Sequence, residues 1–371
     1  MKVPQLMPWI GKEEAKAVRK VIESGWITEG RKSEEFVDSL KKLTGAEYGV
    51  LAPNGTLALF LGLLALNIGS GDEVIVPDTT FAASANAVLL TGATPVLAPV
   101  NNYDYQIDIS KCDNLISEKT KAIMPVHLYG MCADMDSVMS FAKKNNLKVI
   151  EDAAQAIGVR YKGKHAGMFG DIGCFSFFAD KTITTSEGGF VVCNNKDIYN
   201  NLLLLRNQGR IERGSFIHPH IGYNFRMTDM QSAIGLVQLA KLEKIKEKKN
   251  EILGWYKEKL QDVGEIKFLE LEEGSEYIPF RTVIICERAH DLMDYLARNK
   301  IQPRSVFYPL HKQPYFEKLG NPDIERFNLS DERFPNAIYG YEHGVCLPVF
   351  PQLTQEQVDY VCSVISNFYN A

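Results

Sequence analysis

Short apolar runs alternate with helical stretches along the first half of the chain. The runs are predicted to be strands: Tyr48 to Ala52, Asp72 to Pro77, Pro95 to Ala98, Ala122 to Val126 and Leu147 to Ile150. Helical stretches lie between them, at Leu57 to Leu66, Phe81 to Leu90 and Met135 to Lys144. Strands and helices that alternate in this way form an α/β domain, in which helices cover a mostly parallel sheet.

The alternation ends near Lys246. Beyond it, the predicted elements are strands at Ile266 to Leu269 and Thr282 to Cys286, and helices at Asp291 to Asn299 and Thr354 to Tyr369. A chain of 371 residues is long enough for one large and one small domain. We therefore predict a large α/β domain over residues 1–245 and a smaller α+β domain over residues 246–371.

A long helix is predicted from Asp229 to Leu260, across this boundary. It contains a basic run, Lys241 to Lys249, which Glu243 and Glu247 interrupt. Interleaved charges of this kind predict a solvated helix face. The formal net charge of the chain is −5, so no overall positive field draws it to nucleic acid or to a membrane.

The seven cysteines are an odd number, and no two of them have the C-x-x-C spacing of a zinc site. This pattern favours reduced thiols over a disulfide framework, and we expect no metal. The chain starts without a long apolar run, so neither a signal peptide nor a membrane span is expected. These features predict a cytoplasmic protein.

One lysine lies between two strand-like runs, Cys174 to Phe178 and Gly189 to Cys193. Partial burial would lower the pKa of Lys181, and a lysine that is neutral near pH 7 can form a Schiff base. Ser176 and the threonines after Lys181 offer hydroxyl groups to a phosphate. Taken alone, Lys181 is more typical of a solvated loop lysine, since most lysines are solvated.

Two further segments place polar groups at the ends of predicted strands. Asn54-Gly55-Thr56 joins a strand to a helix, so free N–H groups at the helix N-terminus form a possible anion site. Asp152 and Gln155 follow the strand that ends at Ile150, at the edge of a parallel sheet where ligands bind. The alternative for both segments is an ordinary helix cap.

Gly158 to His165 comes close to the phosphate-binding pattern G-x-x-x-x-G-K-[ST]. His165, however, stands where that pattern requires a hydroxyl for Mg²⁺. Tyr161-Lys162-Gly163-Lys164 is also more typical of a hairpin turn than of a helix start. We therefore reject a nucleotide hydrolase of this class.

The motifs taken together resemble the DegT/DnrJ/EryC1/StrS sugar aminotransferases, from S-G-W-I-T at Ser24 to C-L-P at Cys346. The resemblance implies the aspartate-aminotransferase fold, fold type I of the pyridoxal-phosphate enzymes. Lys181 would then hold the cofactor, and Asp152 would pair with its pyridinium nitrogen. The corresponding cofactor-binding positions are Gly55, Thr56, Phe81, which would stack on the ring, Gln155, near the ring hydroxyl, and Ser176.

The same resemblance assigns residues to the substrate and to a partner subunit. Trp26 and Thr28 would lie at the rim of the active site, and Arg304 and His311 near the substrate. Asn224, in the segment G-Y-N-F-R-M, would reach the cofactor phosphate of the neighbouring subunit, which implies a homodimer with shared active sites. Considered singly, Trp26 is equally typical of a packing residue, and a lone histidine such as His311 is more often structural.

Within the family, the chain most resembles enzymes that aminate C4 of a nucleotide-linked 4-keto-6-deoxy sugar, a perosamine-type reaction in surface-glycan or O-antigen synthesis. The resemblance favours a GDP-linked substrate and L-glutamate as amino donor. UDP- or dTDP-linked sugars, amination at C3, and a regulatory protein without turnover are the alternatives. Dehydratases of this fold carry histidine in place of Lys181. Ser186 departs from the family, which usually has glycine there.

Overall fold

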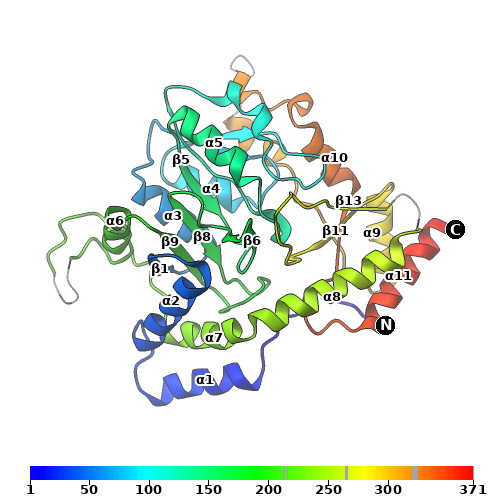
Figure 1. The fold of residues 1–371 in the computed structure, drawn as a ribbon, viewed down its shortest axis with the longest axis horizontal. Helices are drawn as coiled ribbons and strands as arrows, with labels where there is room; N and C mark the ends of the chain where they lie inside the picture. Colours follow the sequence, from blue (N-terminus) through cyan, green and yellow to red (C-terminus); the bar gives the residue numbers. More distant parts are fainter. Residues whose placement is uncertain (212–213, 215, 264–265, 320–324, 371) are drawn as a thin grey trace.

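A computed structural model describes residues 1–211, 214, 216–263, 266–319 and 325–370 (Figure 1). The other positions, which fall within the two predicted domains, lie outside the described residues. Two sheets organise the chain. The first half forms a large sheet covered by helices, and the last third forms a small sheet with helices of its own.

The large sheet has seven strands in the order β1-β9-β8-β5-β4-β2-β3. The central pairs from β8 to β3 are parallel, whereas β9 is antiparallel to both β1 and β8. The mixed, mostly parallel sheet predicted from the alternating pattern is therefore confirmed. The strands are β1 (Tyr48–Ala52), β2 (Glu73–Pro77), β3 (Thr94–Ala98), β4 (Thr120–Ile123), β5 (Lys148–Asp152), β8 (Ile172–Ser176) and β9 (Gly189–Cys193).

Helices bury both faces of this sheet. Alternate residues of a strand point to opposite faces, so Val74 and Val76 belong to one hydrophobic cluster and Ile75 to another. The first cluster packs against α3 (Gly55–Ala65), α4 (Ala83–Leu90) and α6 (Lys196–Arg206), and the second against α2 (Arg31–Thr44) and α5 (Met135–Asn145). Burial on both faces explains why these strands are almost wholly apolar in sequence.

The small sheet is antiparallel, with the order β10-β11-β13-β12. Its strands are β10 (Lys267–Phe268), β11 (Thr282–Ile285), β12 (Arg304–Ser305) and β13 (Gly344–Leu347). A third hydrophobic cluster joins this sheet to α8 (Leu242–Leu260), α9 (Ala289–Arg298) and α11 (Gln355–Asn370), and α10 (Pro335–His343) leads into β13. In Figure 1, α8 runs from the large sheet to these C-terminal helices.

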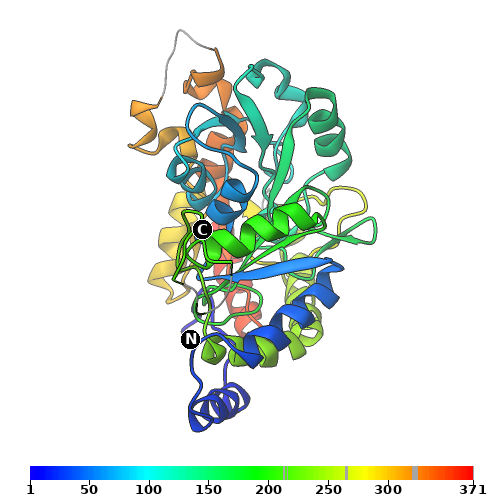
Figure 2. The ribbon, with the colours of Figure 1, turned by 90° about the vertical axis from the view of Figure 1, so that its left-hand side faces the viewer.

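The single helix predicted from Asp229 to Leu260 is wrong, because two helices occupy this segment. α7 (Asp229–Ala240) ends at Lys241, whose N–H bonds back to Gln238 and Leu239, and α8 starts at Leu242. The Lys241 side chain pairs with Glu13 and Glu14 of α1 (Lys12–Glu23), which lies on α7 at one end of the molecule (Figures 1 and 2). The boundary at 245/246 falls inside α8, and the division into two domains stays a prediction.

The segment that mimics a phosphate-binding loop is a β-hairpin, as predicted. β6 (Arg160–Tyr161) pairs with β7 (Lys164–His165), and the turn residues Lys162 and Gly163 have φ angles of 48° and 82°. Positive φ at both turn positions is typical of the tightest hairpins. Within the described residues, no helix is long and apolar enough to cross a membrane, and no cluster of metal-ligating side chains forms.

Candidate active site

A cavity of about 640 Å³ opens where β5 and β8 end and α3 begins. This is the edge of a parallel sheet at which α/β proteins bind ligands. The cavity brings together eight residues predicted from the sequence: Gly55, Thr56, Phe81, Asp152, Gln155, Ser176, Lys181 and Arg304. Other residues that line it, among them Asp180, Glu187, Phe280, Arg281 and Phe307, were not predicted.

Lys181 lies half-buried in the connection between β8 and β9. Its Nζ is 4.6 Å from the centre of the Phe280 ring. Burial lowers the pKa of Lys181, and the positive charge of Arg281 acts in the same direction, while Asp180 and Asp152 oppose the shift. The lowered pKa increases the fraction of neutral amine, which is the nucleophilic form.

Two arginines surround the carboxylate next to Lys181. Arg281 donates to Asp180 at 2.7 Å, and the Arg304 guanidinium is 3.9 Å from the same oxygen. The Arg281 guanidinium also lies 4.4 Å from the centre of the Phe280 ring. Arg281 stands 101 residues from Asp180 in the sequence, and no local motif signals the pair.

The start of α3 forms an anion site beside Ser176. Asn54 caps the helix, since its side chain accepts the N–H of Leu57 at 2.9 Å. The N–H groups of Gly55 and Thr56, in the first turn, have no acceptor within the helix. A Cβ at Gly55 would lie only 2.7 Å from the Cβ of Ser176, so glycine permits the close approach of the helix to that hydroxyl. These donors and the helix dipole suit a phosphate.

Asp152, at the end of β5, is buried, and its two carboxylate oxygens are held by separate donors. Oδ1 accepts the N–H of Ala154 at 3.1 Å, and Oδ2 accepts the hydroxyl of Ser84 at 2.7 Å. The Ser84 hydroxyl is in turn 2.9 Å from that of Thr80. A carboxylate oriented in this way suits the protonated ring nitrogen of a pyridine cofactor. Ser84 was missed because it is 68 residues away and belongs to no motif.

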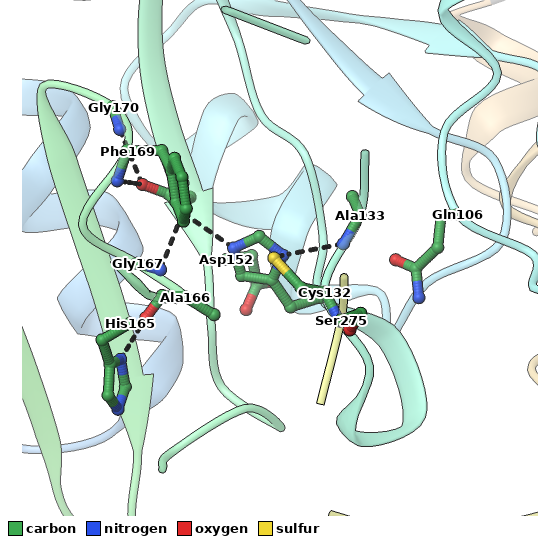
Figure 3. Close-up of polar contacts among 12 residues, drawn as sticks. Gln106, Cys132, Ala133, Asp152, His165, Ala166, Gly167, Phe169, Gly170 and Ser275 are labelled. Carbon is green, nitrogen blue, oxygen red and sulfur yellow. Dashed lines mark hydrogen bonds and ion pairs between the residues drawn. The ribbon is translucent and has the colours of Figure 1, made fainter. Parts of the chain in front are cut away.

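A second buried carboxylate fixes the strand behind Asp152. Glu151 accepts the N–H groups of Gly167, Phe169 and Gly170 at 2.6 to 2.7 Å. Its other partner is His127 Nε2 at 2.8 Å, while the N–H of Ala133 points at His127 Nδ1. This pattern makes Nε2 the protonated nitrogen. Figure 3 shows the network beside Asp152, in which the Glu151 and His127 side chains are fully buried.

Aromatic rings form another part of the cavity wall. Phe81 is 60% exposed, and its ring lies 6.1 Å from that of Phe307, which stacks on Tyr129 at 5.6 Å. Gln155 Oε1 accepts the N–H of Tyr129 at 2.8 Å. The amide group of Gln155 is thereby oriented, which leaves its NH₂ group as the donor for a ligand.

Four predicted residues, Trp26, Thr28, Asn224 and His311, do not line this cavity. Trp26 is 53% exposed, and its indole N–H donates to Glu29 at 3.1 Å. Thr28 lines a different cavity of about 720 Å³, next to Glu29. Asn224 is exposed and pairs with Asn207 through a short β-bridge. The preceding polar loop, residues 207–219, includes positions 212, 213 and 215, which lie outside the described residues.

His311 is the fourth predicted residue outside the cavity lining. Its side chain is fully buried, with Nδ1 2.7 Å from Asp78, and its ring stacks on Phe334 at 4.6 Å. The His311 side chain has no exposed surface in this structure, and its place near the substrate stays a prediction.

The fold and this site define a pyridoxal-phosphate aminotransferase. The chain belongs to the DegT/DnrJ/EryC1/StrS aminotransferase family, whose model matches residues 8–366, and the enzymes of this family depend on pyridoxal phosphate. The lysine, the carboxylate and the phosphate-binding groups of the cavity fit that cofactor.

Relatives of this chain include named sugar enzymes. A GDP-perosamine synthase of Escherichia coli O157:H7 is 40% identical over 99% of both chains. A UDP-N-acetyl-3-dehydro-alpha-D-glucosamine 3-aminotransferase of Acidithiobacillus ferrooxidans is 35% identical over 94% of this chain and 91% of the other. The PLP form of the putative sugar aminotransferase Spr1654 from Streptococcus pneumoniae superimposes with a TM-score of 0.93 at 27% identity, covering 100% of this chain and 99% of the other.

Proposed function

We propose that this enzyme transfers the amino group of L-glutamate to C4 of a GDP-linked 4-keto-6-deoxy sugar. The product is a perosamine-type amino sugar for O-antigen or another surface glycan. The observation that carries the proposal is the cavity in which Lys181, Asp152 and the α3 anion site converge. The relative named GDP-perosamine synthase supports the choice of sugar.

Each of the predicted cavity residues has a separate role toward the cofactor in this proposal. Pyridoxal phosphate supplies an electron sink for the carbon that loses or gains a proton. Gly55, Thr56 and Ser176 would hold its phosphate, and Asp152 would keep its ring nitrogen protonated. Phe81 would stack on the ring, and Gln155 would donate to the ring hydroxyl.

Lys181 has two roles in this proposal. Its neutral amine would bind the cofactor, and the free Lys181 Nζ would move the proton as general base and then as general acid. The lowered pKa of Lys181 favours the first role and brings the group closer to the working pH for the second. Arg304, half-exposed at the cavity wall, supplies a positive charge to the substrate.

We infer further that two chains share each active site in a homodimer. Trp26, Thr28 and Asn224 lie away from the cavity of their own chain, with Trp26 and Asn224 exposed. This placement is consistent with contacts to the cavity of a partner chain. All seven cysteines are buried free thiols, which fits the proposed cytoplasmic location.

Reduction of the holoenzyme with borohydride tests the role of Lys181. Reduction fixes the cofactor to the lysine that binds it, and peptide mapping then identifies that lysine. We expect the label on Lys181, and we expect Lys181→Ala to lose both the label and turnover. Lys249, the other buried lysine near the cavity, is the matched control. A label on Lys249, or on any other lysine, would overturn the assignment.

The related UDP-sugar 3-aminotransferase makes a UDP-linked substrate aminated at C3 the second candidate. The two candidates predict different products from the same glutamate-loaded enzyme. Incubation with GDP- and UDP-linked keto sugars in parallel, followed by NMR of the aminated carbon, distinguishes them.

A further inference from the structure

Lys249 breaks the pattern of the helix that carries it. The buried side of α8 is formed by Leu242, Ile245, Ile252 and Tyr256, and Lys249 lies on the same side with an exposed fraction of 4%. The solvated face predicted for the basic run is therefore wrong at this position. Its spacing of four residues from Ile245 and three from Ile252 places Lys249 among the apolar side chains.

The amine of Lys249 reaches the backbone next to the active site. Its Nζ donates to the carbonyl of Pro279 at 3.0 Å. The next two residues are Phe280, whose ring lies under Lys181 Nζ, and Arg281, which pairs with Asp180. Lys249 and Lys181 also line one small cavity of about 20 Å³.

The opposite side of the same segment is also held. The N–H groups of Ile278 and Phe280 donate to the carbonyls of Gly130 and Tyr129, each at 3.0 Å. A Cβ at Gly130 would overlap the carbonyl oxygen of Ile278, so this approach requires glycine. Residues 278–281 are thus clamped between the Tyr129–Gly130 turn and α8, and Lys249 provides the clamp on the α8 side.

We propose that Lys249 is a positioning residue of the active site, because its hydrogen bond to Pro279 holds Phe280 and Arg281 against Lys181 and Asp180. The proposal rests on the role of Lys181 given above. A buried lysine is unfavourable unless its amine has a hydrogen-bond partner, and apolar packing of α8 does not require an amine at this position. The proposal gives this amine a function.

The electrostatic setting agrees with this role. Burial lowers the pKa of Lys249 to about 7, the charges of Arg281 and Lys181 act in the same direction, and Asp180 opposes them. At pH 8 the group is therefore mostly a neutral amine that still donates its hydrogen bond. The charged groups that act on Lys181 are Asp180, Asp152 and Arg281, and Lys249 orients Arg281 through the backbone.

The test compares Lys249→Met with Lys248→Met. Lys248 is the adjacent lysine and pairs at the surface with Glu251, so its variant is the matched control. The first readout is the rate at which the apoprotein binds pyridoxal phosphate. This rate is monitored by visible absorption and is measured at a series of pH values. The midpoint of this profile reports the ionisation of Lys181. The other readouts are kcat and KM for glutamate, and the melting temperature.

We expect Lys249→Met to fold and to shift the midpoint upward, because a released 279–281 segment lets water reach Lys181 and moves Arg281 away. A shift of about half a pH unit or more corresponds to the loss of one buried hydrogen bond. kcat should fall about tenfold with little change in KM. Lys248→Met should match the wild type, and Lys249→Gln, which keeps a neutral donor, should recover part of the loss.

An unchanged midpoint and kcat in folded Lys249→Met would overturn the proposal, and so would equal changes in Lys248→Met. If neither Lys249→Met nor Lys249→Gln folds, the amine serves the stability of α8, which also overturns the proposal. The map of the cofactor-binding lysine is independent of these results. A label away from Lys181 refutes the proposed site, whereas a label on Lys181 with unaffected Lys249 variants refutes the role of Lys249 alone.

Discussion

Asp152 is the residue whose surroundings most clearly match a single chemical task. Ser84 and Ala154 hold its two oxygens, and the cavity lies beside them. The proposed task is to keep the ring nitrogen of the cofactor protonated, which requires the negative charge and not only the shape of the side chain.

Asp152→Asn keeps the shape and removes that charge. We expect the variant to fold and to retain some cofactor, with kcat lower by about 10²-fold or more, because the ion pair contributes a few kcal/mol in the transition state. Steady-state kinetics together with the absorption of bound cofactor measure both effects. Turnover near that of the wild type would show that another group supports the ring nitrogen.

Ser186 has a φ of 73° in the loop that returns from Lys181 to β9, where the family usually has glycine. Its N–H donates to the Thr184 hydroxyl at 2.9 Å. A φ of this sign places the serine in the left-handed backbone region, which has a steric cost for serine but not for glycine. We expect Ser186→Gly to raise the free energy of unfolding by about 0.5 kcal/mol, the steric gain less the entropy of glycine. Urea denaturation measures this change.

Ser186→Ala is the control for that experiment, because alanine keeps the steric cost and removes only the hydroxyl. An equal gain in both variants would mean that the hydroxyl, and not the backbone angle, destabilises the wild type.

Residues of the site that belong to local motifs could be predicted from the sequence, and those that meet only in space could not. Asp152, Ser176 and Lys181 follow or join strands that the apolar pattern marks. Arg281 lines the cavity and Lys249 contacts the segment before Arg281, but the sequence neighbours of the two residues indicate only a strand and a charged helix. The burial of His311 against Asp78 is likewise a contact in space that its sequence neighbours do not indicate.

The helix α8 packs against both the large and the small sheet, and its buried side carries a titratable group, the amine of Lys249. The pKa of Lys249 is about 7 in the folded chain, against an ordinary value of 10.5. Between these two values the unfolded chain binds more protons than the folded chain, so folding stability rises with pH over this range. Below about pH 7 both states are charged, and the folded state carries the full penalty of burial.

Lys249→Met removes this titration. We expect the variant to exceed the wild type in unfolding free energy most at pH 6, by up to a few kcal/mol, and the difference to shrink as pH rises from about 7 towards 10.5. Urea denaturation of the two proteins across this range measures it. A difference that does not change with pH would mean that Lys249 stays charged in the folded protein.

The apolar spacing was enough to predict most segments as helix or strand, but it did not predict where some of these helices begin and end. The break between α7 and α8 occurs at Lys241, with neither proline nor glycine there, and its side chain pairs with Glu13 and Glu14 of α1. α2 was not predicted, although Gly30 and Gly45 flank it, and Asp229 stabilises its first turn by accepting the N–H groups of Gly30, Lys32 and Ser33. Both features depend on contacts between distant segments.

For the whole molecule, the order of strands and helices was enough to predict the class of fold, because alternating elements have few ways to pack. The proposed sharing of active sites between two chains goes further. It predicts that two different inactive chains can complement each other in one dimer.

Lys181→Ala and Asn224→Asp are suited to this test. The first lacks the cofactor lysine, and the second places a negative charge where the partner's cofactor phosphate would bind. A mixed dimer contains one site with both defects and one site with neither. Purified heterodimers should therefore recover up to about half of the wild-type activity, whereas heterodimers as inactive as both parents would mean that Asn224 does not serve a partner's site.

The most direct test of the function is the transfer of nitrogen itself. Holoenzyme is incubated with ¹⁵N-labelled L-glutamate and a GDP-linked 4-keto-6-deoxy sugar, and the product is analysed by mass spectrometry and NMR. The account predicts a GDP-linked sugar with the label on C4, formed by the wild type and not by Lys181→Ala. A label on C3, or amination of only UDP- or dTDP-linked sugars, would contradict it.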